Sequence, residues 1–111
     1  MLEALWSVEF QSNMGVFGNG IVVFETGRIF GGDSTMIYTG SFGIVNDTIV
    51  SELHVRKYAS IRGVGSAVGF NDFHLKLTGK PDPKVMHLTG YVVEDPNRKM
   101  TIKATRQAEL P

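Results

Sequence analysis

Three histidines are the residues of this sequence whose type and spacing best suit metal chemistry. His54, His74 and His87 each lie in a segment of alternating apolar and polar residues, on its polar side. If these segments are antiparallel neighbours with connections centred on Val64 and on Lys80–Pro81, His54 lies opposite His74, and His74 opposite His87. Three imidazoles with an open position form a catalytic zinc arrangement. The interpretation that we favour is three solvent-facing strand residues that bind no metal, because a one-residue slip in register would separate the row.

Asp33, Tyr38 and Tyr58 are candidates for acid-base chemistry. Asp33 follows Gly31 and Gly32, where a carboxylic acid could stand at the mouth of a pocket. An aspartate in such a turn more often accepts hydrogen bonds from the turn amides. No two of these groups have a spacing that enforces a catalytic pair, and no serine stands in a G-x-S-x-G setting. A small enzyme is therefore the alternative function and not the first.

The glycine-rich segment from Gly63 to Gly69 follows a strand and superficially matches a dinucleotide-binding loop. Such a loop needs a following helix whose N-terminus meets the pyrophosphate. The residues from Phe70 to Leu77 indicate another strand instead. We expect an ordinary loop there and predict no cofactor.

Composition narrows the class of protein. The chain has 111 residues, 11 basic and 11 acidic side chains and no cysteine. This length suits one domain over residues 1–111 with one modest core. Balanced charge without a basic patch argues against direct nucleic-acid binding, and the lack of cysteine excludes disulfide frameworks and thiolate chemistry. Because no apolar run approaches the ~20 residues of a membrane helix and no signal peptide is recognisable, we expect a cytoplasmic protein that avoids membranes.

Apolar residues at every second position, separated by glycine-rich turns, predict an all-β fold. Strands are expected over residues 5–11, 16–25, 28–30, 36–42, 48–58, 70–77, 86–93 and 99–105. Gly18 and Gly20 suggest a bulge or bend in the second of these strands. About eight antiparallel strands with short links favour a small up-and-down barrel, because closure removes exposed strand edges. A two-sheet β-sandwich is the alternative.

The interior of such a barrel is either filled by side chains or holds one small ligand. The clearest alternation lies within residues 48–58, where Ile49, Ser51, Leu53 and Val55 share one face. The residues that we expect to line an apolar ligand-binding interior are Trp6, Val8, Phe10, Leu53, Val55, Phe73, Leu75, Leu77, Met86 and Leu88.

Two segments, Ile21 to Phe24 and Met36 to Tyr38, are apolar on both faces. An antiparallel strand with one face in water does not require this pattern. Either a homodimer or partner contact covers the outward side chains, or the chain's own long loop does. The residues expected on this surface are Val22, Phe24, Met36 and Tyr38.

Several short motifs resemble the GrlR-like negative regulators of bacterial type III secretion. They lie in the first half of the chain and comprise Leu5-Trp-Ser-Val-Glu-Phe10, Gly18-Asn-Gly20-Ile-Val-Val, Gly27-Arg-Ile-Phe-Gly31-Gly32-Asp33-Ser34, Tyr38-Thr-Gly40 and Leu53-His-Val-Arg-Lys-Tyr58. The resemblance implies a lipocalin-like barrel that dimerises, has an apolar interior suited to a lipidic or other small molecule, and sequesters a transcriptional activator. Where the family can carry an acidic partner-binding loop, this chain has Gly43 to Asp47, with one acid.

Two functional hypotheses follow from the sequence. The first is a non-enzymatic binding or regulatory module, expected to be a homodimer, that holds a small apolar ligand or contacts a regulatory protein. The alternative is a small metal-dependent or acid-base enzyme that uses the barrel mouth or the histidine row.

Overall fold

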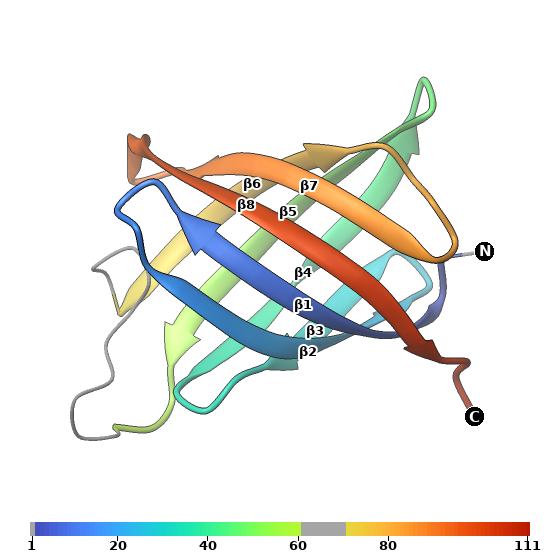
Figure 1. Ribbon diagram of the computed structural model, residues 1–111, viewed down its shortest axis with the longest axis horizontal. Coiled ribbons are helices and arrows are strands. Elements are labelled where there is room, and N and C mark those ends of the chain that lie inside the picture. The colour runs from blue at the N-terminus through green and yellow to red at the C-terminus, as the bar shows by residue number, and fades with distance from the viewer. Residues whose placement is uncertain (1, 61–70) are drawn as a thin grey trace.

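The computed structural model describes residues 2–60 and 71–111 and arranges eight strands as a barrel (Figure 1). The strands are β1 (Ala4–Ser12), β2 (Phe17–Glu25), β3 (Arg28–Gly32), β4 (Met36–Val45), β5 (Thr48–Lys57), β6 (Asp72–Gly79), β7 (Val85–Val92) and β8 (Asp95–Ala108). Each strand pairs antiparallel with the next, and β8 pairs with β1, so the barrel is closed. The prediction of an all-β up-and-down barrel is confirmed, and the sandwich alternative is wrong. The described residues contain no helix that could cross a membrane.

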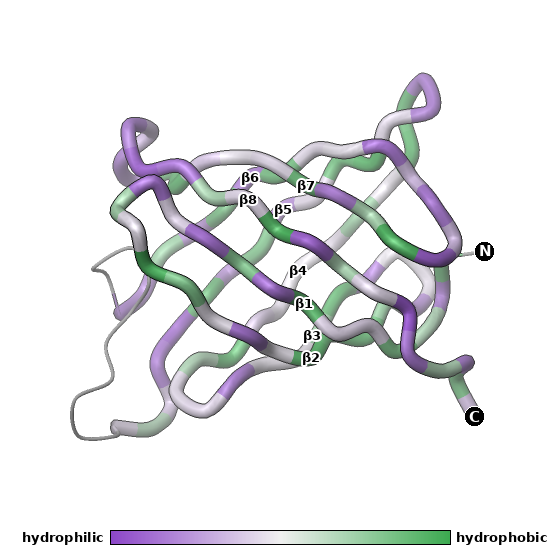
Figure 2. The backbone as a smooth tube through the Cα atoms, in the orientation of Figure 1, coloured by the Kyte–Doolittle hydropathy of each residue, from purple (hydrophilic) through white to green (hydrophobic). Residues whose placement is uncertain are grey.

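Alternating side chains decide which face of each strand points inward. In β5, Ile49, Ser51, Leu53 and Val55 are all buried, whereas Glu52, between two of them, is exposed. Figure 2 shows the hydropathy changing along the strands in the same manner. Eight curved strands of this kind enclose one apolar interior.

Two tight turns fix the register of neighbouring strands. The β2–β3 turn places Thr26 at φ 51° and Gly27 at φ 76°, and the β4–β5 turn places Asn46 at φ 51° and Asp47 at φ 61°. Two successive residues with positive φ are the mark of a type I′ hairpin turn, whose twist matches that of the flanking strands. Both turns lie in the gaps between the strands that the sequence predicts.

The expected bulge at Gly18 and Gly20 is absent, because the β1–β2 pairing runs without interruption from Ala4 opposite Phe24 to Gln11 opposite Phe17. These glycines instead make room for aromatic rings inside the barrel. A Cβ at Gly18 would lie 2.3 Å from Cζ of Phe10, and one at Gly20 would lie 2.9 Å from the Tyr38 hydroxyl oxygen.

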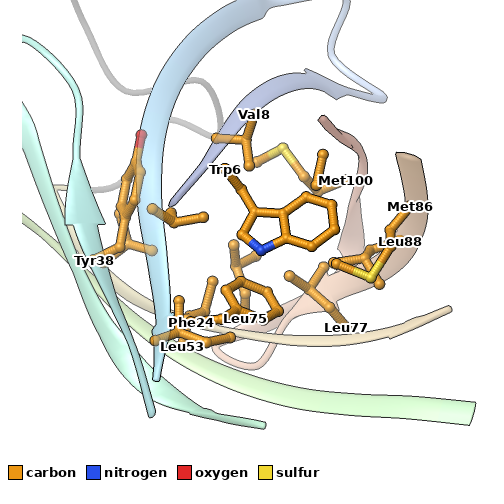
Figure 3. Close-up of a cluster of buried hydrophobic side chains, with 14 of the residues drawn as sticks. Trp6, Val8, Phe24, Tyr38, Leu53, Leu75, Leu77, Met86, Leu88 and Met100 are labelled. Atoms are coloured by element: carbon orange, nitrogen blue, oxygen red, sulfur yellow. The ribbon is translucent and has the colours of Figure 1, made fainter. Parts of the chain in front are cut away.

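Trp6 fills the end of the barrel at which β1 begins. Its side chain is fully buried, and its indole nitrogen donates a hydrogen bond to the Leu2 carbonyl at 2.9 Å. The Phe24 ring centre lies 5.9 Å from that of Trp6, and the Arg106 guanidinium lies 6.0 Å from the Trp6 ring centre. Figure 3 shows Trp6 within the surrounding cluster of buried side chains. Burying a large apolar side chain contributes about 1.5 to 3 kcal/mol, so this end is a stabilising plug.

Candidate functional site

An apolar cavity of about 180 Å³ lies inside the barrel, above the Trp6 plug. Its mouth lies between residues 16–19, at the start of β2, and residues 33–35, in the β3–β4 turn. The lining comprises Val8, Phe10, Val16, Phe17, Gly18, Asn19, Val22, Phe24, Ile29, Asp33, Ser34, Thr35, Met36, Tyr38, Ser51, Leu53, Val55, Phe73, Leu75, Leu77, Leu88, Met100, Ile102 and Ala104. Most of these side chains are apolar, so the cavity suits an apolar ligand.

Eight of the ten residues expected in a ligand-binding interior line this cavity. They are Val8, Phe10, Leu53, Val55, Phe73, Leu75, Leu77 and Leu88. Trp6 and Met86 also point inward, but both are fully buried in the plug and do not line the cavity. Alternation identifies the inward face of a strand but not the position of each residue along the barrel axis. The sequence therefore could not distinguish residues that line the cavity from residues in the plug.

The surface predicted from Val22, Phe24, Met36 and Tyr38 is wrong, because all four side chains are buried in the interior. Val22 on β2 lies opposite Trp6 on β1, so both side chains point into the barrel. The four side chains all line the cavity. The outward apolar residues of the same region are Ile21, Val23, Phe30 and Ile37.

A network of hydrogen bonds surrounds Asp33 at the cavity mouth. Its Oδ1 accepts from the amides of Thr35 at 2.9 Å and Met36 at 2.8 Å, and its Oδ2 accepts from the Tyr38 hydroxyl. The Tyr58 hydroxyl donates to the Asp33 carbonyl at 2.7 Å. The interpretation of Asp33 as an acceptor for turn amides is confirmed. These bonds hold one side of the mouth in a defined shape.

Tyr38 acts in this network as a hydrogen-bond donor. Burial raises its pKa well above the usual range, and the hydrogen bond to Asp33 and the charge of that residue act in the same direction. A tyrosine that keeps its proton cannot serve as a general base.

The histidine pair His54 and His74 lies on the outer face, away from the cavity. The two residues are directly opposite in the β5–β6 register, as predicted, and their rings stack with centres 4.5 Å apart. His54 Nε2 lies 2.7 Å from Asp72 Oδ1, and His74 Nδ1 lies 2.6 Å from Glu94 Oε2. Hydrogen bonds from the His74 amide and ring lower the pKa of Glu94. Each imidazole therefore has its own carboxylate partner.

His87 does not extend the histidine row, so the alternative hypothesis of a three-histidine metal site is wrong. In the β6–β7 register Gly79 lies opposite Leu88, and His87 pairs with Lys103 on β8. The connection over residues 80–84 contains two prolines, which lack the amide hydrogen that a ladder needs, so pairing starts later than a tight hairpin would allow. Among the residues that the structure describes, no group of three His, Cys, Asp or Glu side chains could hold a metal ion.

Several lining residues were not assigned to the site from the sequence. Ser51 is the most informative, because a polar residue on an otherwise apolar strand face was a visible signal. Met100, Ile102 and Ala104 alternate within the strand expected over residues 99–105, but nothing in the sequence fixed their position along the barrel axis. The glycine-rich segment Gly63 to Gly69 lies outside the described residues.

Comparisons with known proteins support the fold. No family model and no curated protein matches the sequence. Among solved structures, a redesigned beta barrel is similar, with 14% identity, a TM-score of 0.52, and coverage of 96% of this chain and 91% of that chain. At this identity the likeness shows the fold alone, and the chain is an eight-stranded antiparallel β-barrel.

Proposed function

We propose that this chain is a non-enzymatic binding protein that holds one small apolar molecule inside its barrel. The observation that carries the proposal is the cavity itself, which is apolar and about 180 Å³ in volume. A core selected for stability alone is close-packed, because each void forfeits dispersion contacts. An interior that is filled at one end and hollow at the other is what a binding protein requires.

The cavity volume limits the size of the ligand. An apolar cavity of about 150 Å³ accommodates benzene. A single six-membered ring with one or two substituents, or a short chain of similar bulk, therefore suits this cavity. A long fatty acyl chain would extend beyond the mouth.

The chemistry at the mouth favours binding over catalysis. Among the described residues, Asp33 and Tyr38 are the titratable side chains that line the cavity, and they hydrogen-bond to each other. Asp33 also accepts from the turn amides of Thr35 and Met36, so its carboxylate is engaged in holding the turn. Tyr38, with its raised pKa, remains a donor. Both residues are better suited to shaping the mouth than to transferring protons.

Titration with toluene tests the proposal. We expect amide chemical shifts of residues lining the cavity to change saturably in the wild type. Ala104→Leu adds bulk to a fully buried lining position and should weaken binding, whereas Ala108→Leu makes the same change at an exposed position of the same strand and should not. A wild type whose shifts change with neither toluene nor the similarly sized phenol, up to their solubility limits, would contradict the proposal.

A second proposal concerns the outer apolar face, which we define as Ile21, Val23, Phe30 and Ile37. Phe30 is 41% exposed and lies opposite Val23, and Ile21 is 46% exposed. Apolar patches of this kind usually mark contacts with other molecules. We propose that a second copy of the chain covers this face in a two-fold dimer, which needs only one self-complementary patch.

Light scattering after size-exclusion chromatography tests the dimer. We expect Phe30→Lys to give a monomer and Thr89→Lys, an exposed position on β7, to leave the dimer intact. A wild type that elutes as a monomer at all concentrations would contradict this proposal. If the dimer also sequesters a transcriptional activator, as the resemblance implies, and does so in the cytoplasm, where we expect the protein to be, the partner would not meet an acidic loop. The residues from Gly43 to Asp47 form the end of β4 and a two-residue turn.

A further inference from the structure

Ser51 is an unusual residue in the barrel interior. Its side chain is only 3% exposed, and its Oγ has no hydrogen-bond partner among the described residues. Its neighbours across the ladder are Phe42 on β4 and Leu77 on β6, neither of which has a side-chain polar atom. A buried hydroxyl that lacks a partner is destabilising, and nearly all buried polar groups in folded proteins have one. Stability therefore does not explain why a serine occupies this position.

Ser51 lies deep in the cavity, apart from the other polar lining groups. On β5 the inward residues run from Val55 near the mouth, through Leu53, to Ser51. The remaining polar residues that line the cavity are Asn19, Asp33, Ser34, Thr35 and Tyr38. They belong to the mouth or to the layer directly below it, since Tyr38 lies opposite Val55. Below that layer, Ser51 carries the one polar side chain among the lining residues that the structure describes.

We propose that Ser51 is the polar anchor of the ligand site and that the ligand is a neutral, ring-sized molecule whose buried end carries a hydroxyl or carbonyl group. This inference rests on the function proposed for the cavity. A serine hydroxyl can both donate and accept, so either group can pair with Ser51 Oγ. The apolar body of the ligand then lies between Leu53, Val55 and the other apolar side chains above the serine.

The ligand is neutral because none of the described lining residues would balance a charge at its buried end. No Lys, Arg or His side chain lines the cavity among the described residues, and the Asp33 carboxylate at the mouth disfavours an anion. Burying an unpaired charge is far more costly than burying a hydrogen-bonded hydroxyl. The site should therefore select alcohols, phenols or ketones over carboxylic acids of the same size.

Three probes of one shape test the inference: phenol, toluene and benzoate. Phenol and toluene differ by a hydroxyl in place of a methyl group, and benzoate adds a negative charge. Their dissociation constants are measured by calorimetry or chemical-shift titration for the wild type, for Ser51→Ala, and for Ser41→Ala, which removes an exposed hydroxyl on β4. Thermal melting of each variant confirms folding, and Ser51→Ala should be at least as stable as the wild type because it removes an unpartnered buried hydroxyl.

We expect Ser51→Ala to lower the preference for phenol over toluene by roughly three- to tenfold, the value of one hydrogen bond, and Ser41→Ala to leave it unchanged. Benzoate should bind more weakly than phenol to all three proteins. If phenol and toluene bind but Ser51→Ala leaves their ratio unchanged, the anchor role is overturned while the proposed function stands. Benzoate binding as tightly as phenol overturns the neutral-ligand assignment. If neither phenol nor toluene binds the wild type, the proposed function itself fails.

Discussion

Replacing Tyr38 with phenylalanine measures what the mouth network contributes to stability. The Tyr38 side chain is 7% exposed, and its hydroxyl donates to the Asp33 carboxylate. A hydrogen bond to a charged group contributes about 1.5 to 3 kcal/mol. Because Asp33 is only half-buried, water can replace part of the lost bond. We expect Tyr38→Phe to lower the free energy of unfolding at neutral pH by about 1 to 2 kcal/mol.

The same substitution should change how stability depends on alkaline pH. Burial holds the pKa of Tyr38 above its usual range in the folded protein, whereas an unfolded tyrosine ionises near pH 10. Above about pH 10 the folded state binds one more proton than the unfolded state, so the free energy of unfolding falls as the pH rises. One such group removes about 1.4 kcal/mol between pH 8 and pH 11. Tyr38→Phe lacks this contribution.

Urea unfolding from about pH 7 to about pH 11 separates these effects. The wild type and Tyr38→Phe should differ most at neutral pH and converge towards the alkaline limit. Tyr91→Phe, which changes an exposed tyrosine on β7, should follow the wild type. A gap between wild type and Tyr38→Phe that stays constant with pH would refute the assignment of Tyr38 as a buried donor.

Three further predictions concern packing and charge. Gly18→Ala places a Cβ 2.3 Å from Cζ of Phe10, so the ring must move; we expect a loss of about 1 to 3 kcal/mol in thermal unfolding and weaker toluene binding. Leu53→Ala removes a buried lining side chain and should cost about 2 to 5 kcal/mol by urea unfolding while admitting naphthalene, seen by titration. Glu94→Gln removes the carboxylate that pairs with the His74 amide and ring, and on this exposed surface it should cost at most about 1 kcal/mol at neutral pH. Because the Glu94 pKa is lowered, that difference should vanish in acid unfolding experiments as the pH falls through the folded-state pKa.

The sequence was sufficient to predict the barrel, because strand alternation and turn chemistry are local. The face shared by Ile49, Ser51, Leu53 and Val55 could be derived directly, since an inward apolar set and an outward polar set differ clearly. Where both faces of a strand are apolar, as from Ile21 to Phe24, the sequence pattern does not distinguish the inward face from the outward face. Pairing with β1 then decides which face is inward, and that pairing is a property of the folded barrel.

Positions along the barrel axis were harder to predict than faces. They depend on where each ladder begins, and a connection such as residues 80–84 shifts the start by several residues. This shift moved His87 away from His74 while leaving both on outward positions. The register depends on the loops, so a site that is assembled from three or more strands is difficult to predict from the sequence.

Stability and the proposed ligand binding depend on different parts of the interior along the barrel axis. At the plug, the inward positions carry Trp6, Ile49 and Met86, all fully buried. Near the mouth, inward positions of β2 are occupied by Gly18 and Gly20, which leave space for rings and for the cavity. An eight-stranded barrel is just wide enough to be filled by side chains, so a cavity persists only where small residues occupy inward positions. The plug can thus stabilise the fold while the other half of the barrel retains the cavity in which we propose that a ligand binds.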